Sequence, residues 1–152
     1  MPPTGGEGSD RNSEIGFQVR SWAKAHGGRC FESNVAFRLP NGAKRSPDAS
    51  WIAIERWKTL STKQRKGYPP ICPDFVVELR SETDRLVVLQ EKMDEYIENG
   101  VRLGWLIDPL LKQVQIYRPG QQIELLQQPD SISGETVLPG FVLDLRPIWI
   151  DS

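Results

Sequence analysis

Two carboxylates and one lysine, Asp48, Glu78 and Lys92, are the residues of this sequence best suited to chemistry. Glu78 lies late in the apolar run ICPDFVVELR (71–80). Burying a carboxylate there is costly unless a cation or a metal ion compensates its charge. Two carboxylates can hold a hard cation that acidifies a bound water, and an ammonium group can orient that water or neutralise developing charge. Together they form a minimal set for metal-assisted hydrolysis of a phosphodiester.

The pairing of Asp48 with Glu78 depends on two expected strands, at about 48–54 and 71–80. If these strands are antiparallel neighbours, the start of the first lies beside the end of the second, so both carboxylates meet at one end of the sheet. Asp74 lies roughly 13 Å further along its strand, at ~3.3 Å per residue, and is expected to begin the strand in a structural role. Arg80 shares a face with Glu78, so an ion pair between them is the alternative to a metal site.

Lys92 belongs to the most clearly predicted helix, residues 85–99, which Thr83 or Asp84 can cap and Gly100 ends. The helix has one apolar stripe: Leu86, Leu89, Met93, Tyr96 and Ile97. Lys92 lies at the border of this stripe, and its helix follows directly from the strand that carries Glu78. The helix should therefore pack across the same sheet and bring its ammonium group toward the carboxylates. The alternative is a surface lysine whose methylene chain covers apolar neighbours.

The remaining elements predict a mixed sheet with few helices. We expect a first helix that Asp10 or Asn12 caps and Gly27-Gly28 ends, with an apolar stripe that includes Phe17. The other expected segments are a strand at 30–39, a hairpin turn at 40–42, a polar basic connector at 55–70, strands at 103–108 and 113–118, and a pair at 121–127 and 141–145 that closes a sheet edge. This order predicts an α/β (α+β) fold rather than a doubly wound one. Residues 1–10 are expected to form a flexible segment, and residues 11–152 a single domain.

Composition narrows the functional classes. A chain of 152 residues, 38% of them hydrophobic and five of them tryptophan, can bury one core. It has no apolar run of about 18 residues and no basic-apolar leader, which predicts a soluble cytoplasmic protein without a membrane partner. Its two cysteines do not suggest a disulfide scaffold or a zinc site. With a net charge of −1, any nucleic acid must be held by a local basic patch. The candidates are Lys58, Lys63, Arg65 and Lys66 in the connector and Arg38, Lys44 and Arg45 before it; the alternative is a solvated loop.

Several motifs in order resemble one bacterial family over nearly the whole chain. They are SPDASWIAIERW, ICPDFVVELRS, LQEKMDEYIENG followed by LGWLIDP, then QIYRPG and LPGFVLDL. They closely resemble the Uma-type family, formerly a domain of unknown function, whose members are assigned as restriction endonucleases of the PD-(D/E)XK nuclease superfamily. The resemblance implies a restriction-endonuclease-like domain, in which a mixed β-sheet is flanked by helices.

The resemblance also implies roles for individual residues. Asp48 in Ser46-Pro47-Asp48 matches the first acidic signature and Glu78 the second, and these two would coordinate Mg²⁺ or Mn²⁺. Arg80 occupies the usual lysine position, a departure from the superfamily pattern, and Lys92 in the following helix is where this family places its lysine. A guanidinium stays protonated and cannot act as a base, so Arg80 either supports the site or replaces the lysine poorly. Glu14 resembles an acidic residue that supplements such sites, with an ordinary surface glutamate as the alternative.

The resemblance predicts a Mg²⁺-dependent DNA endonuclease. Relatives carry an additional segment before the equivalent of MPPTGG, which implies a missing edge element here and favours a partner subunit, such as a second copy in a homodimer. Together with Arg80, this supports the alternative function, a non-catalytic module that keeps the nuclease fold to bind nucleic acid or another protein. The joint presence of Asp48, Glu78 and Lys92 supports the enzyme, and the lysine argues against a two-carboxylate glycosidase.

Overall fold

The computed structural model describes residues 5–150. The helices are α1 (Gly6–His26), α2 (Ile54–Trp57), α3 (Thr62–Lys66), α4 (Leu86–Glu98) and α5 (Arg146–Trp149). The strands are β1 (Arg29–Glu32), β2 (Phe37–Arg38), β3 (Lys44–Arg45), β4 (Ala49–Ile52), β5 (Phe75–Leu79), β6 (Leu103–Asp108), β7 (Gln113–Tyr117), β8 (Glu124–Gln127), β9 (Ser131–Ser133) and β10 (Val142–Asp144). None of the helices among these residues is long and apolar enough to cross a membrane.

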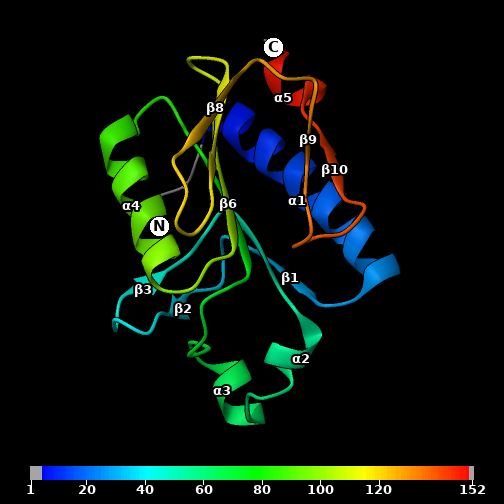
Figure 1. Ribbon diagram of the computed structural model, residues 1–152, viewed down its shortest axis with the longest axis vertical. Helices are drawn as coiled ribbons and strands as arrows, with labels where there is room; N and C mark the ends of the chain where they lie inside the picture. The colour runs from blue at the N-terminus through cyan, green and yellow to red at the C-terminus, as the bar shows by residue number, and fades with distance from the viewer. Residues whose placement is uncertain (1–4, 151–152) are drawn as a thin grey trace.

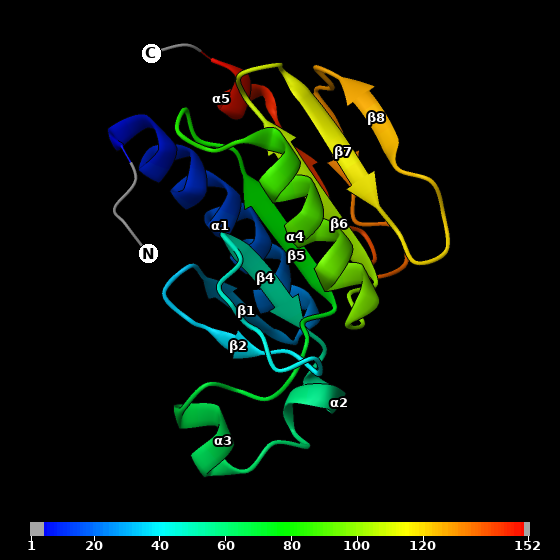
Figure 2. The same ribbon diagram turned by 90° about the vertical axis from the view of Figure 1, so that its left-hand side faces the viewer.

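The core of the fold is a six-stranded mixed sheet in the order β1-β4-β5-β6-β7-β8. Only β5 and β6 pair in parallel, through the crossover helix α4, and the other neighbours are antiparallel. Figures 1 and 2 show α1 and α4 on opposite faces of this sheet, with β9, β10 and α5 on the α1 side. The single mixed sheet flanked by helices confirms the predicted fold class.

The strand β5 lies in the middle of the sheet because its residues are apolar and β-branched on both sides. All five of its residues are buried, as expected for a strand covered by a helix on each face. Phe75, Val77 and Leu79 face the core around α1, whereas Val76 faces the core around α4. Alternation along the strand therefore turns Glu78 toward α4 as well.

Close contact between α4 and the sheet depends on Gly104 in β6. A Cβ atom at this position would lie 2.7 Å from the terminal methyl group of Met93, which is too close for an unshifted side chain. Leu89, Met93 and Tyr96 are the buried residues of α4, in line with the predicted stripe. Without a side chain at 104, the helix lies near enough for its polar side chains to reach Glu78.

The starts of α1 and α4 differ from those expected from the sequence. The helix α1 starts at Gly6, so the segment predicted to be flexible (1–10) is helical from Gly6 onward, and residues 1–4 lie outside the described residues. Phe17, placed in its apolar stripe by the sequence, is 66% exposed. The cap of α4 is Arg85, with no side-chain hydrogen bond, because Asp84 instead accepts from the backbone N–H and hydroxyl of Ser81.

Three strand predictions also need correction. The strand expected at 30–39 is two short strands, β1 and β2, and the hairpin turn joins β2 to β3 rather than to β4. The segment around 141–145 pairs as β10 with β9 in a separate small sheet, so of the expected pair only β8 joins the main sheet, as the edge strand beside β7. The polar connector contains two short helices, α2 and α3.

Candidate functional site

Asp48 and Glu78 lie opposite each other at one end of the sheet. The strands β4 and β5 are antiparallel with Ala49 facing Val77, so the next pair outward is Asp48 and Glu78. The Asp48 Oδ2 atom accepts a hydrogen bond of 2.7 Å from the backbone N–H of Leu79, which fixes its carboxyl group beside the strand. The two carboxyl groups are hydrogen-bonded to each other. The sequence-based expectation that these two side chains meet is therefore met in the fold.

The helix α4 provides two further polar groups to Glu78. The Tyr96 hydroxyl donates a hydrogen bond of 2.9 Å to Glu78 Oε1, and the Lys92 Nζ atom lies 3.7 Å from the same oxygen. Glu78 is 3% exposed, whereas the Lys92 side chain is 31% exposed. The lysine therefore lies between the buried carboxylate and solvent, where it can reach both the carboxyl group and a molecule bound outside it.

Burial and mutual repulsion leave a proton on this carboxyl pair. Burial, followed by the adjacent Asp48 carboxylate, raises the pKa of Glu78 to about 8, against the opposing effect of Lys92. Burial also raises the pKa of Asp48, opposed mainly by the hydrogen bond from Leu79. Glu78 is therefore largely protonated at neutral pH and donates its proton to Asp48. Burial, together with the charge that Glu78 carries at high pH, raises the pKa of Tyr96, which keeps the phenol a donor.

The donor set fits a hard divalent cation. Among residues 5–150, no group of three or more His, Cys, Asp and Glu side chains gathers around one point. A cation such as Mg²⁺, however, is usually held by one or two carboxylates, with waters and substrate phosphates completing its shell. Asp48 and Glu78 present only oxygen atoms, and the proton between them lies where a cation would relieve the same repulsion. Asp48 and Glu78 are thus suited to hold Mg²⁺ or Mn²⁺.

Arg80 does not pair with Glu78, contrary to the alternative drawn from the sequence. Its Nη1 atom lies 2.9 Å from Oδ2 of Asp108, and its Nε donates to the backbone carbonyl of Asp84 at 3.3 Å. Asp108 is fully buried at the end of β6, and its other oxygen accepts the backbone N–H groups of Leu110 and Leu111. The parallel register explains the contact, because Glu78 faces Leu106 and Arg80 is thus level with Asp108. Arg80 stabilises the loop ends beside the site.

The Glu14 carboxylate contacts Gln18 rather than Asp48 or Glu78. Its carboxylate accepts a hydrogen bond of 3.0 Å from Gln18, which also bonds the backbone of Asp144. Both residues are on α1, which covers the sheet face opposite α4 (Figure 1). No described contact joins Glu14 to Asp48 or Glu78. Its proposed supplementary role thus has no support from the geometry.

Asp74 has the structural role expected of it. It is 2% exposed, and its two oxygens pair with Arg56 and Arg102, each at 3.0 Å. It also accepts the backbone N–H of Ala53. It therefore joins α2, β5 and the start of β6 rather than contributing to the carboxyl pair.

Tyr96 and Asp108 are the two site neighbours that the sequence did not reveal. Tyr96 reads as one more apolar residue of the helix stripe, although a buried tyrosine usually needs a partner for its hydroxyl group. Its position four residues after Lys92 was a usable signal, because side chains at that spacing lie side by side on a helix. Asp108 is the last residue of the apolar run LGWLID (103–108), just as Glu78 lies late in its own apolar run. A carboxylate in such a run usually needs a cationic partner, and this was the signal that could have identified Asp108.

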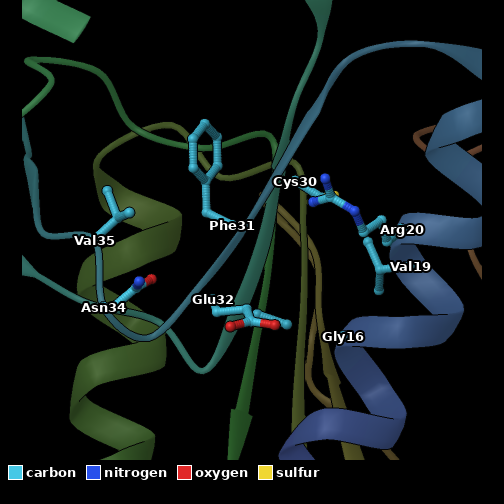
Figure 3. A pocket seen from close by; sticks show the side chains of 9 residues that line it. Gly16, Val19, Arg20, Cys30, Phe31, Glu32, Asn34 and Val35 are labelled. Atoms are coloured by element: carbon cyan, nitrogen blue, oxygen red, sulfur yellow. The ribbon is translucent and has the colours of Figure 1, made fainter. Parts of the chain in front are cut away.

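A cavity of about 340 Å³ lies around the edge strand β1, lined both by residues of α1 and by the segment 30–35. Figure 3 shows Glu32 and Cys30 of β1 together with Arg20 and Gly16 of α1 along its wall. Ala49, the residue after Asp48, also lines it. None of the three residues Asp48, Glu78 and Lys92 does, so the cavity is not the carboxyl site itself.

The carboxyl pair makes a testable prediction about stability without metal. In EDTA we expect the free energy of unfolding to fall as the pH rises from about 4.5 to about 8. The pKa of Glu78 is about 8 in the folded chain and ordinarily 4.5. The folded state therefore holds the proton more tightly, and this stabilisation, complete below the lower pKa, is lost as the pH passes the higher one. Asp48 contributes in the same direction.

Urea unfolding between pH 5 and pH 9 measures this effect. The Glu78→Gln variant should lose most of the decline, whereas Asp94→Asn, at an exposed position of α4, should retain it. Millimolar Mg²⁺ or Mn²⁺ should restore stability at high pH, because a ligand of the folded state stabilises it by mass action. An equally steep decline in Glu78→Gln would contradict the assignment.

Comparison with known proteins places the chain in a family. The family described as "Uma2: Putative restriction endonuclease" matches residues 1–146. The crystal structure of a "putative nuclease belonging to DUF820" from Anabaena variabilis ATCC 29413 is 22% identical in sequence and superposes with a TM-score of 0.80, covering 97% of this chain and 83% of that chain. The cryo-EM structure of a DrdV–DNA complex has 15% identity and a TM-score of 0.43, covering 82% and 85% of the two chains. No curated protein matches the sequence significantly.

Proposed function

This chain belongs to the Uma2 family, described as "Putative restriction endonuclease", and from that membership and its carboxyl site we propose that it is a Mg²⁺-dependent DNA endonuclease. The observation that carries the proposal is the meeting of Asp48 and Glu78 at one sheet end with Lys92 3.7 Å from Glu78. The cation beside Glu78 is the Lys92 side chain, which is 31% exposed and therefore also faces solvent.

Each residue has a definite task in this proposal. Asp48 and Glu78 hold Mg²⁺ or Mn²⁺, which when bound supplies an acidified water and neutralises charge on the phosphate. The N–H of Leu79 and the hydroxyl of Tyr96 fix the two carboxyl groups, so that their oxygens point at one place before a ligand arrives. Lys92 reaches from the helix to the outer side of Glu78. There its ammonium group orients the attacking water or stabilises the negative charge that develops on the phosphate.

The alternative is a module with this fold that binds nucleic acid or another protein without cutting. One observation favours it: Arg80, at the position where the superfamily usually has its lysine, is tied to Asp108 and the Asp84 carbonyl. A guanidinium held in this way neither takes up a proton nor moves toward a substrate. The enzyme hypothesis therefore requires the ammonium group of Lys92 to take the role of the lysine that the superfamily usually has at the position of Arg80. The substitution of Lys92 is therefore the sharpest test.

We expect the purified protein to nick or cut DNA with Mg²⁺ or Mn²⁺ and not with EDTA. Lys92→Ala should lower the cleavage rate by about 10²–10⁴-fold, the usual loss when a group that assists proton transfer or charge stabilisation is removed. It should leave metal binding, measured by calorimetry, in place. Lys24→Ala, at an exposed position of α1 on the opposite face, is the matched control and should cut like the wild type. Absence of cutting by the wild type, with retained salt-dependent DNA binding, would instead support the non-catalytic module.

A further inference from the structure

Positive charge is concentrated in two stretches of the chain. Residues 33–47 and 56–73 contain eight lysines and arginines and no acidic residue, which leaves 11 of the 19 basic residues and all 20 acidic ones to the rest of the sequence. A mildly acidic protein thus has two stretches that are exclusively basic. Charges of both signs are usually interspersed on a soluble surface, so this segregation is a feature that needs an explanation.

The two stretches form one surface. The backbone N–H of Arg38 in β2 donates to the carbonyl of Pro69 at 3.0 Å, and Lys44 Nζ in β3 lies 4.2 Å from the centre of the exposed Tyr68 ring. Figure 2 shows α2 and α3 projecting beyond the end of the sheet, beneath β2. We call this region the basic surface; it comprises Arg38, Lys44, Lys58, Lys63, Arg65 and Lys66.

The charges of the basic surface are not neutralised within the molecule. Among residues 5–150, none of its six members has a carboxylate partner, whereas the other two basic residues of these stretches do: Arg45 pairs with Glu95 and Arg56 with Asp74. Lys58, Lys63 and Lys66 are exposed. Their mutual repulsion costs stability in the isolated protein, and a polyanion bound across them would relieve that repulsion.

Contacts within residues 54–66, which we call the arm, anchor α2 and α3 to the sheet. Ser61 and Gln64 form reciprocal capping bonds at the start of α3. Trp57 packs against Phe31 of β1 with their ring centres 5.2 Å apart, and the Arg65 guanidinium lies 5.6 Å from the centre of the Trp57 ring. These contacts place the lysines of the arm beyond the end of the sheet.

The basic surface is continuous with the carboxyl site. Arg45, next to Lys44 and three residues before Asp48, pairs with Glu95 on α4, the residue before the Tyr96 whose hydroxyl bonds Glu78. From Asp48, β4 runs toward α2, and Ala53 is about 16 Å further along at ~3.3 Å per residue. The phosphates of one DNA strand advance about 3.4 Å along the helix axis per nucleotide, so for a duplex lying along β4 the arm begins roughly five nucleotides from the carboxyl pair.

We infer that the basic surface binds the phosphate backbone of double-stranded DNA on one side of the bond that is cut. The identification of the polyanion as DNA rests on the proposed function; the location of the site rests on the charges and contacts alone. The array of lysines suits regularly spaced phosphates, which position a duplex without reading its sequence. The residues of the carboxyl site then act on a strand that the arm already holds.

The test compares two variants that each lose two exposed positive charges. Lys63→Ala/Lys66→Ala changes the arm, whereas Arg20→Ala/Lys24→Ala changes two exposed residues of α1, the helix on the sheet face opposite α4. Binding of a 30-base-pair duplex in EDTA is followed by fluorescence anisotropy between 50 and 200 mM salt. We expect the arm variant to bind at least about tenfold more weakly at 100 mM salt, with a log–log salt slope shallower by about 2, since each phosphate contact contributes about 0.9 to the slope. The α1 variant should bind like the wild type.

Equal affinities and salt slopes for the two variants would overturn the inference. So would binding through the same lysines of duplex RNA or polyglutamate in clear preference to DNA. Cleavage is measured separately on plasmid with Mg²⁺. A wild type that does not cut, but binds DNA through Lys63 and Lys66, would refute the proposed endonuclease and support the inference. If the wild type cuts DNA but both variants bind DNA equally well, the endonuclease proposal is supported and the inference about the basic surface is refuted.

Discussion

Asp48→Asn and Glu78→Gln should each lower Mg²⁺-dependent cleavage by about 10³-fold or more. Each change keeps the shape of the side chain and replaces one charged oxygen by an amide nitrogen, which cannot bind the cation. Without the cation, the attacking water keeps its high pKa and the phosphate keeps its charge, and several kcal/mol of transition-state stabilisation are lost. Plasmid nicking under single-turnover conditions measures the effect.

The same two variants should remain folded, and this separates lost chemistry from lost structure. Glu78 is protonated and buried in the metal-free protein, so a glutamine can keep the Tyr96 bond without the cost of a buried charge. Glu78→Gln should therefore be at least as stable as the wild type in EDTA at pH 8, while it cuts far more slowly. Asp94→Asn, at an exposed position two residues after Lys92, is the control and should cut normally. Unchanged metal-dependent cleavage in both site variants would indicate a contaminating nuclease.

The carboxyl pair could be predicted from the sequence because it depends on local patterns and one pairing. The buried run of β5 and the position of Asp48 at the start of β4 place both acids at one sheet end as soon as the strands are taken as antiparallel neighbours. The lysine followed from the apolar stripe of α4, which indicates the helix face in contact with the sheet. Alternation in a strand and the period of a helix indicate that these three side chains can meet, but such spacing alone is a weak signal for a site, and the resemblance to the Uma-type family made the prediction specific.

The partner of Arg80 could not be predicted, because it depends on the register between β5 and β6. Alternation along β5 puts Arg80 on the face of Glu78, which made an ion pair between them the simplest assumption. The parallel register instead brings Asp108 level with Arg80, and a fully buried aspartate attracts the guanidinium more strongly than a protonated glutamic acid can. No local signal in a single sequence gives the register of two strands separated by a helix.

The errors at the ends of elements have a different cause. Gly5 and Gly6 disfavour a helix by their own propensity, yet α1 begins at Gly6, so tertiary contacts of its later turns outweigh the cost. The strand expected at 30–39 breaks at a turn near Asn34, after which Phe37 packs into the core on the α4 side. Local propensity is a weak guide where packing decides, and these errors lie away from the carboxyl pair.

Arg80→Ala should destabilise the protein by about 3–5 kcal/mol while leaving most of the cleavage activity. The change removes the charged partner that Asp108 has among residues 5–150; Asp108 is 0% exposed, and an uncompensated buried carboxylate costs about this much. The N–H groups of Leu110 and Leu111 still bond the other oxygen, which favours the lower end of the range. Urea unfolding gives the loss, and cleavage is measured well below the melting temperature, where the variant is folded.

Arg102→Ala is the matched control for this prediction. Its partner Asp74 is equally buried, but Asp74 keeps Arg56 and the N–H of Ala53 after the change, and the Arg102 side chain is 48% exposed. Its loss should therefore cost about 1 kcal/mol or less. In the double variant Arg80→Ala/Asp108→Asn, the buried charge is gone, so the loss should be smaller than the sum of the two single losses. A fall in cleavage of 10² or more in Arg80→Ala, with an unchanged melting temperature, would instead place the guanidinium on the scissile phosphate and give it a direct part in catalysis.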